Sequence, residues 1–499
     1  MVFNTFIRCQ VCGSITRVRL QVGWQEEHPI VVACGKCGIS LSGNVKIGQE
    51  KPELTFSFDN ADEVLDENAD YMVECSGEFP TVKQGDAVDL VGLVITPFIR
   101  YMNCMETDDS YEQFGKAVSQ LNDTSKKWKN YKRIITLFNN KSEYLVQEIQ
   151  KVFSGQYFQC RDESEVLRAV HMIEVHGFYS SLKKDILDDL SFSSGIMKMD
   201  SVQLKNLIDY LNSHDGFHLD EMQELIYKLY DEFITVYQRL IPALAIQYCK
   251  EGSFNFECEG STTSSFDSVK QFYLDVYEAL GNLLIIPVAL NNIKYRSDIN
   301  SMNSVEKNVN SLDDFIKLTK ATRYHFCLDN EVYTGVLDVV VNAKLRNAIG
   351  HNDVEYDAVK QLITYIPNPK DRTKKKTEYL LEFENEALHM FQGLLGISEY
   401  LYRLRELALM YDGKVPLIVQ ERANWPKKIG RNDRYPCGSG KKYKFCHGKS
   451  KKIRSRRWQL KRKQFYYDQF PKWPIRGGDD RTSYAAIYSS KVENLICSH

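Results

Sequence analysis

The residue pattern in this 499-residue chain that most directly suggests chemistry is Arg346 followed, five positions later, by His351. A guanidinium keeps its charge and binds a phosphate through two parallel hydrogen bonds. An imidazole, with an ordinary pKa of about 6.5, takes up and releases a proton near neutral pH. These two side chains supply what is needed to cut RNA without a metal ion, so both are candidate catalytic residues.

The residues between them fit this role. Asn347 adds a second polar group beside the arginine, and Ala348 and Gly350 are small enough for close approach. Gly350 also suits the left-handed conformation that often ends a helix. On an unbroken helix, positions five apart differ by about 140° in direction. Arg346 and His351 therefore converge only if the helix ends there or if a second copy completes the site. Spacing alone is also compatible with an ordinary helix end that carries a solvated arginine and a capping histidine.

The segment resembles the R-x4-H motif of the HEPN superfamily, whose common form is Arg-Asn, three mostly small residues and then His. The resemblance covers about residues 265–412 and implies a helical domain that dimerises and cuts RNA, without a metal, at a cleft between two copies of the motif. It makes His351 the catalytic histidine, Arg346 the phosphate-binding arginine and Asn347 the polar residue beside it. It also implies products with 2′,3′-cyclic phosphate or 3′-phosphate ends.

The composition is that of a globular protein, with 43% hydrophobic and 26% charged residues. The length predicts roughly two to four domains. The net charge of -2 is unevenly distributed, because residues 434–467 hold thirteen Lys or Arg and no acidic residue, whereas residues 50–78 are rich in Asp and Glu. A basic tail on an acidic body is typical of a protein that binds nucleic acid or a protein partner.

Neither a membrane span nor a signal peptide is expected. The longest apolar run, around residues 281–290, is far shorter than the roughly 20 residues that a span needs, and no signal peptide precedes the first cysteines. Thirteen cysteines, an odd number with several in C-x2-C spacing, indicate metal sites in a reducing compartment rather than disulfides. We therefore expect a cytoplasmic protein.

Residues 1–95 predict a β-rich domain that contains two C-x2-C pairs, Cys9 with Cys12 and Cys34 with Cys37. Two such pairs separated by 21 residues, each beside glycine, have the spacing of a zinc ribbon, in which two turns bring four thiolates to one tetrahedral ion. We expect a structural Zn²⁺ here. Unpaired structural cysteines are the alternative.

Residues 96–260 carry apolar residues at three- and four-residue steps and predict a helical scaffold or sensor domain with no evident chemistry. After the motif, residues 358–366 and 377–383 alternate as two strands around a basic turn. This turn either steers RNA or is an ordinary solvated loop. A helix over residues 386–411 closes the HEPN-like domain, 265–412. The expected fold class is mainly α, with helical bundle domains, a small β-rich ribbon and a small C-terminal module.

Residues 426–450 resemble a SEC-C motif, the small zinc-binding module also found at the end of the bacterial preprotein translocase ATPase. The resemblance makes Cys437, Cys446 and His447 metal ligands. A fourth ligand is usually a cysteine where this chain has Tyr435. Because a structural zinc normally has four ligands, the fourth comes from elsewhere, or the ion is weakly held or absent.

The basic tail, residues 451–499, places an aromatic ring among cations, which is the combination that binds a phosphate backbone and stacks on a base. The candidate RNA-binding residues are Lys451, Lys452, Arg454, Arg456, Arg457 and Trp458. A merely solvated tail is the alternative.

Two hypotheses follow. The first is a metal-independent endoribonuclease of HEPN type, active on RNA as a homodimer and, as the resemblance implies, related to anti-phage defence or toxin nucleases. The second is a non-catalytic RNA- or ribosome-binding adaptor, in which the ribbon, the helical domains and the SEC-C tail are all interaction modules for RNA or a protein partner.

Overall fold

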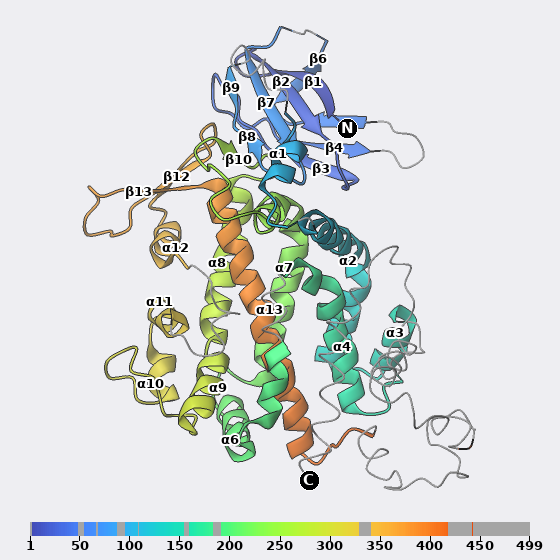
Figure 1. The fold of residues 1–499 in the computed structure, drawn as a ribbon, viewed down its shortest axis with the longest axis vertical. Coiled ribbons are helices and arrows are strands. Elements are labelled where there is room, and N and C mark those ends of the chain that lie inside the picture. Colours follow the sequence, from blue (N-terminus) through green and yellow to red (C-terminus); the bar gives the residue numbers. More distant parts are fainter. Residues whose placement is uncertain are drawn as a thin grey trace, which may run out of the picture. The chain divides into compact units, whose positions relative to one another are not determined.

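The chain is mainly α-helical, with a small β-rich region at its N-terminus (Figure 1). The computed structural model describes residues 2–47, 54–65, 68–86, 95–107, 109–153, 159–182, 191–328, 341–417 and 442. The chain divides into two compact units. The first contains residues 1–132, 173–190 and 209–401, and the second contains residues 133–172, 191–208 and 402–499.

The first unit begins with a five-stranded sheet in the order β6-β1-β2-β7-β9. Its strands are β1 (Val2–Cys9), β2 (Ile15–Gln21), β6 (Ala61–Val64), β7 (Tyr71–Ser76) and β9 (Gly85–Asp86). β1 pairs antiparallel with β2, and β2 pairs parallel with β7. On β2, Val18 and Leu20 are buried whereas Arg17 and Arg19 are partly exposed, because successive side chains of a strand point to opposite faces.

A smaller antiparallel sheet shares a hydrophobic core with the five-stranded sheet. It contains β3 (Glu27–Ile30), β4 (Gly43–Ile47) and β5 (Leu54–Phe58). Apolar residues of both sheets form one buried cluster, which includes Cys9 and Cys34. The short strand β8 (Thr81–Val82) pairs with β10 (Glu259–Gly260), so the β-rich region is hydrogen-bonded to a segment far away in the sequence but in the same unit.

Long helices form the core of the rest of the first unit (Figure 1). They are α2 (Ser110–Asn139), α7 (Leu219–Ile246), α8 (Phe266–Leu283), α9 (Ile285–Arg296) and α13 (Leu380–Tyr411), preceded by the shorter α1 (Pro97–Cys104). Their contacts are aromatic: Phe233 of α7 stacks on Phe391 of α13 at 4.0 Å between ring centroids, and Tyr273 of α8 lies 4.5 Å from Phe383. Burial of these large rings is a main source of stability for the bundle.

The helical stretch Phe266–Arg296 meets the length and composition of a membrane span, and 78% of its most apolar window is buried inside the protein. Burial of this kind is also what a core helix of a bundle requires. The sequence expectation that no segment spans a membrane therefore stays a prediction.

Short elements surround the R-x4-H segment. They are α10 (Leu312–Lys317), α11 (Lys320–Arg323), η3 (Tyr324–Leu328), α12 (Ala343–Gly350), β11 (Val354–Asp357), β12 (Leu362–Tyr365) and β13 (Lys376–Tyr379). The three strands form one antiparallel sheet, where the sequence predicted two strands. The second strand is also shorter than predicted, because α13 already begins at Leu380. The Glu382 carboxylate accepts a hydrogen bond from the Tyr379 N–H at 3.0 Å there and so caps the new helix.

The second unit contains α3 (Leu145–Val152) and η2 (Ser191–Lys198). It also contains parts of α2, α4 (Glu163–Phe178), α6 (Ser201–Asn212) and α13. His171 stacks on Tyr402 at 3.9 Å between ring centroids, and Lys414 pairs with Glu163 at 2.7 Å. The described part of this unit contains none of the residues predicted to be catalytic.

Candidate functional site

The R-x4-H segment forms a short helix, α12, that stops at the histidine. The N–H of His351 still donates to a helical carbonyl, and the N–H groups of Asn352 and Asp353 donate into the last turn at 3.1 and 2.9 Å. These last two bonds are the Schellman pattern, in which the residue after the C-cap is left-handed. That residue is Asn352, with φ 56°, so the expectation of a left-handed Gly350 is wrong. The expected helix end next to His351 is present.

Arg346 points along α12 toward the adjacent helix α8. Its Nη2 forms an ion pair with Glu278, and its Nη1 donates to Asn347 Oδ1 at 3.2 Å. Its guanidinium lies 5.6 Å from the ring centroid of Tyr277. The side chain remains 31% exposed, which leaves part of the cation open to solvent.

The structure places Arg346 and Asn347 in the middle of α12 and His351 at its C-cap. Asn347 and His351 are exposed, and Arg346 is partly exposed. Arg346 Nη1 lies 3.8 Å from where a Cβ on Gly350 would be, so the guanidinium lies against the last turn of the helix. Among the described residues no hydrogen bond or ion pair joins Arg346 to His351. Within one chain, Arg346 faces Glu278 of α8, and His351 is the exposed C-cap of α12.

Two functional candidates were missed by sequence reasoning, Glu278 on α8 and Lys320 on α11. Glu278 contacts both the Arg346 guanidinium and the Lys320 ammonium. The aliphatic part of Lys320 lies against Gly281, where a Cβ would come within 3.0 Å of it. No spacing in the sequence links these residues to Arg346, because they belong to three separate helices. The result is a carboxylate held between two cations.

The start of α12 is fixed by a buried polar network around Asn342. Its side-chain oxygen caps the helix, and its side-chain nitrogen donates to Glu378 at 2.9 Å and to the Tyr365 hydroxyl at 3.0 Å. Its backbone N–H donates to Glu386 at 2.6 Å, and the Tyr273 hydroxyl donates to the same carboxyl at 2.7 Å. The position of the motif helix therefore depends on two acidic residues.

These two carboxyl groups retain a proton more readily than ordinary glutamates. Burial, and then the neighbouring Glu386, raises the pKa of Glu378 to about 8. Burial raises the pKa of Glu386 as well. Two close carboxyl groups cannot both ionise cheaply away from water, so the pair favours keeping one proton above the usual pKa of a glutamate. Glu384, with a pKa raised to about 8 by burial, adds a further acid of the same kind on α13.

The basic turn beyond the motif is largely neutralised by its own neighbours. Arg372 pairs with Asp353 at 2.6 Å, Lys375 with Glu355 at 3.2 Å, and a third lysine of the turn with a nearby aspartate. The Arg372 pair ties the β-hairpin to the end of α12. The role of the turn in steering RNA remains a prediction.

The two predicted cysteine pairs come together. All four sulfur atoms, of Cys9, Cys12, Cys34 and Cys37, lie within 4.8 Å of one another. Two of the separations cross from one pair to the other: Cys9 Sγ lies 3.7 Å from Cys37 Sγ, and Cys12 Sγ lies 3.5 Å from Cys34 Sγ. Sulfur atoms spaced in this way fit a tetrahedral ion with bonds of about 2.3 Å. The cluster can therefore hold one metal ion.

Each cysteine pair is shaped by the same turn. Gly13 and Gly38 both have positive φ, 74° and 75°, a conformation that glycine adopts without strain. Their N–H groups donate back to the carbonyls of Cys9 and Cys34 at 2.9 and 2.8 Å. The repeated turn explains why the C-x2-C spacing was informative: it fixes two ligands locally, and only the meeting of the two pairs needs the fold.

The remaining predicted ligands and RNA contacts lie outside the described residues. They are Cys437, Cys446, His447, Lys451, Lys452, Arg454, Arg456, Arg457 and Trp458.

Comparison with known proteins finds similarity only over short segments. No protein-family model matches the chain, and no solved structure matches it significantly. Protein translocase subunit SecA of Xanthomonas oryzae pv. oryzae (strain PXO99A) is 52% identical over 72 residues, which are 13% of this chain and 8% of that protein. SecA of Thermodesulfovibrio yellowstonii is 36% identical over 85 residues, 14% of this chain and 10% of that protein. The chain thus spans about a tenth of the length of these relatives.

Stability is expected to fall as pH rises from about 5 to 8. The folded state keeps a proton on the Glu378–Glu386 pair, whereas the unfolded chain has already released it above the ordinary pKa of a glutamate. The free energy of unfolding therefore decreases as pH rises across this window. Thermal melting at pH 5.5 and pH 8 measures this loss. Glu378→Gln, which keeps a hydrogen-bonding group without a titrating one, should reduce the pH dependence.

The control for this prediction is Glu355→Gln, since Glu355 is an exposed acid of the same sheet, with its side chain 79% exposed. It should leave the pH dependence as it is in the parent protein. Equal melting shifts in both variants would show that the buried pair does not titrate as described.

One metal ion per chain is expected to depend on the four-cysteine cluster. Cys34→Ser should remove one equivalent of metal, measured by elemental analysis of the purified protein, and should lower the melting temperature. Cys104→Ser is the matched control, because Cys104 is a free thiol outside the cluster that donates to the Ser253 carbonyl, as a serine also can. A metal content unchanged by Cys34→Ser would rule out this site.

Proposed function

We propose that the chain is a metal-independent endoribonuclease of HEPN type. The observation that carries the proposal is the placement of a partly exposed Arg346 one turn before an exposed His351, at the end of a helix that stops there. Phosphate binding needs an accessible guanidinium, and proton transfer needs an accessible imidazole. Both conditions hold for the described chain.

In the proposed reaction, a ribose 2′-oxygen forms a bond to the adjacent phosphorus and loses its proton to the His351 imidazole. The bond from phosphorus to the 5′-oxygen breaks, and that oxygen takes a proton from a protonated imidazole. Arg346, with Asn347 beside it, stabilises the charge that builds on the phosphoryl oxygens. Because Arg346 and His351 do not contact each other within one chain, we propose that a homodimer supplies the second imidazole and closes the site around RNA.

Glu278 controls the availability of Arg346 in this proposal. Its carboxylate occupies the guanidinium in the absence of RNA and is 32% exposed, so an RNA phosphate competes with it directly. The neighbouring Lys320 offers a second cation that the same phosphate can reach. Substrate binding then exchanges one anion for another without moving a helix.

The cysteine cluster is proposed to hold Zn²⁺, since four thiolates in tetrahedral arrangement suit zinc. Its part would be structural, stabilising the N-terminal sheets. The short matches to SecA support the proposed SEC-C module in residues 426–450, with Cys437, Cys446 and His447 as ligands. The cytoplasmic location and a role in anti-phage defence or as a toxin are proposed on the HEPN resemblance alone.

An adaptor without catalysis is the second candidate, and the SecA similarity favours it, because this similarity concerns a small segment shared with a much longer protein. In that case the ribbon, the helices and the tail bind RNA, the ribosome or a protein without cutting.

His351→Ala and Arg346→Ala are both expected to abolish most RNA cleavage. Loss of a placed general acid or base costs about 100- to 10,000-fold in rate. The assay incubates the full chain with total RNA and follows fragments on a gel. Lys344→Ala is the matched control, since it removes an exposed cation from the same helix. RNA binding without cleavage by the parent protein would support the adaptor instead.

Glu278→Gln is expected to lower KM for RNA while kcat changes little. Removing the competing charge frees the guanidinium, and a partly exposed ion pair is worth about 0.2–1 kcal/mol, which is about 1.5- to 5-fold in affinity. Steady-state kinetics on one RNA substrate give both constants. A higher KM in Glu278→Gln would mean that the carboxylate assists substrate binding rather than competing with it.

A further inference from the structure

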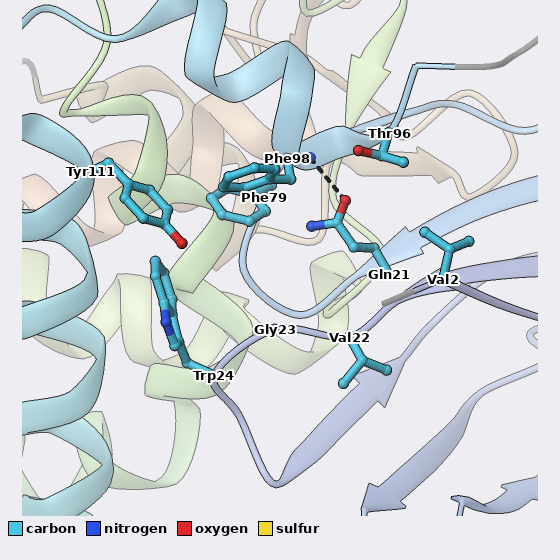
Figure 2. A pocket seen from close by; sticks show the side chains of 9 residues that line it. All are labelled: Val2, Gln21, Val22, Gly23, Trp24, Phe79, Thr96, Phe98 and Tyr111. Atoms are coloured by element: carbon cyan, nitrogen blue, oxygen red, sulfur yellow. Dashed lines mark hydrogen bonds between the residues drawn. The ribbon is translucent and has the colours of Figure 1, made fainter. Parts of the chain in front are cut away.

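A hollow of about 360 Å³ opens beside the N-terminal sheet, and none of its lining residues belongs to the R-x4-H segment (Figure 2). Its lining residues come from the start of β1, the end of β2 with the following loop, the loop after β7, the start of α1 and the start of α2. They are Val2, Gln21, Val22, Gly23, Trp24, Phe79, Thr96, Phe98 and Tyr111. Four of these are aromatic, and a hollow of this size is in the range of small-ligand sites.

The aromatic rings form a continuous wall. Trp24 lies 4.9 Å from Tyr111 between ring centroids, and Tyr111 lies 5.4 Å from Phe98. Phe79 stands behind them, 6.0 Å from Phe98 and 2% exposed. Trp24 is 39% exposed, although burial of such a large ring would be favourable. The wall therefore offers one wide, flat, accessible ring.

Gln21 supplies a buried polar group with a fixed direction. The residue is only 6% exposed, and its side-chain oxygen accepts a hydrogen bond from the Phe98 N–H at 2.9 Å. This bond assigns the oxygen, so the amide nitrogen is the free group. Figure 2 shows that nitrogen turned to the side where the rings lie. Among the described residues this nitrogen has no hydrogen-bond partner, so it is available to an acceptor atom on a ligand.

The loop that carries Trp24 is held from beneath by Glu78. The Glu78 carboxylate accepts hydrogen bonds from the N–H groups of Trp24 and Gln25, at 2.8 and 3.1 Å. Gly23 allows this approach, because a Cβ there would lie 2.4 Å from the carboxylate. These two hydrogen bonds fix the backbone of the loop that carries the indole.

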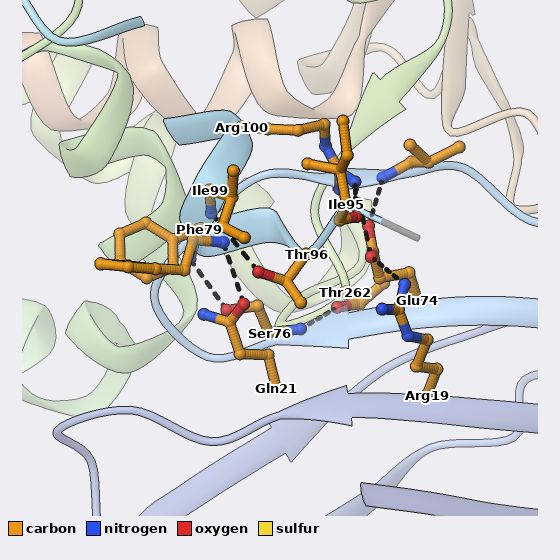
Figure 3. A network of polar contacts seen from close by, with 12 residues as sticks. Arg19, Gln21, Glu74, Ser76, Phe79, Ile95, Thr96, Ile99, Arg100 and Thr262 are labelled. Atoms are coloured by element: carbon orange, nitrogen blue, oxygen red, sulfur yellow. Dashed lines mark hydrogen bonds and ion pairs between the residues drawn. The ribbon is translucent and has the colours of Figure 1, made fainter. Parts of the chain in front are cut away.

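The opposite wall is anchored by a second buried carboxylate. Glu74 of β7 pairs with Arg19 of β2 at 3.1 Å and with Arg100 of α1, which joins the start of α1 to the sheet (Figure 3). α1 carries Phe98, and Thr96 precedes it. Both walls of the hollow are therefore held in place by contacts within the protein itself, without a ligand.

We propose that this hollow binds a nucleobase. A flat heteroaromatic ring can stack on Trp24 and also accept a hydrogen bond from the Gln21 amide nitrogen. One such ring therefore uses both the aromatic wall and the polar group of the site. An aliphatic side chain would leave that amide unpaired. The proposal does not depend on cleavage by Arg346 and His351. The base can belong to a free nucleotide or to an unpaired position in RNA, and the test separates these sources.

In the first arm, the full chain is titrated with AMP, GMP, CMP and UMP, and with ribose 5-phosphate as a probe that lacks a base, by calorimetry. In the second arm, a short single-stranded RNA is titrated into His351→Ala, so that cleavage does not consume the probe. Binding of nucleotides assigns a free nucleotide. Binding of the RNA alone, with the same dependence on Trp24 and Gln21, assigns an unpaired base. Both results support the proposal.

Trp24→Leu is expected to weaken binding by about 5- to 150-fold, the effect of removing one aromatic ring from a stacked base. Gln21→Glu, assayed at pH 8, keeps the acceptor for Phe98 and replaces the donor, and should weaken binding by about 2- to 10-fold. Tyr295→Leu is the control, because Tyr295 is 44% exposed and does not line the hollow. If Trp24→Leu does not fold by circular dichroism, Trp24→Phe replaces it, with a smaller expected loss.

The proposal is overturned if none of the nucleotides or the RNA binds, or if ribose 5-phosphate binds as well as they do. It is also overturned if the Trp24 variant binds no more weakly than Tyr295→Leu. Since no readout here is RNA cleavage, a failure of the proposed nuclease activity would leave this test intact.

Discussion

The ion pair between Glu278 and Arg346 is the contact on which the candidate active site depends. An arginine side chain on a solvated helix end has many rotamers, and a carboxylate on another helix selects one of them. The same carboxylate contacts Lys320, so α8, α11 and α12 meet at one acidic group. Because both partners in the Arg346 pair are about a third exposed, the contact positions the guanidinium without removing it from an incoming phosphate.

The short length of α12 is the second constraint. Asn342 fixes its first turn, through buried bonds to Glu378 and Glu386, and the Schellman turn ends it at His351. The end of the helix leaves the His351 imidazole exposed at the C-cap. The buried acids that hold Asn342 favour a shared proton, which links the position of the motif to the protonation of groups that do not touch RNA in the proposed reaction.

The parts of these sites that depend on local spacing could be predicted from the sequence. The C-x2-C turns and the helix end at His351 each involve residues within a few positions, so their geometry follows from the backbone. Glu278 gave no such signal, because its pairing with Arg346 exists only after two distant helices pack. The left-handed residue was assigned to Gly350 on its type, whereas the hydrogen bonds place it at Asn352. The aromatic hollow around Trp24 could not be predicted from the sequence either, since its residues come from five separate segments.

The most direct test of the account is the chemistry of the RNA ends. RNA is incubated with the folded, metal-loaded full chain in EDTA, and the fragments are analysed by mass spectrometry. Attack by a 2′-oxygen with only an imidazole and a guanidinium predicts 2′,3′-cyclic phosphate or 3′-phosphate ends, each facing a free 5′-hydroxyl. Fragments with 5′-phosphate and 3′-hydroxyl ends, or cleavage that stops in EDTA while the protein stays folded, would contradict the proposed roles of Arg346 and His351.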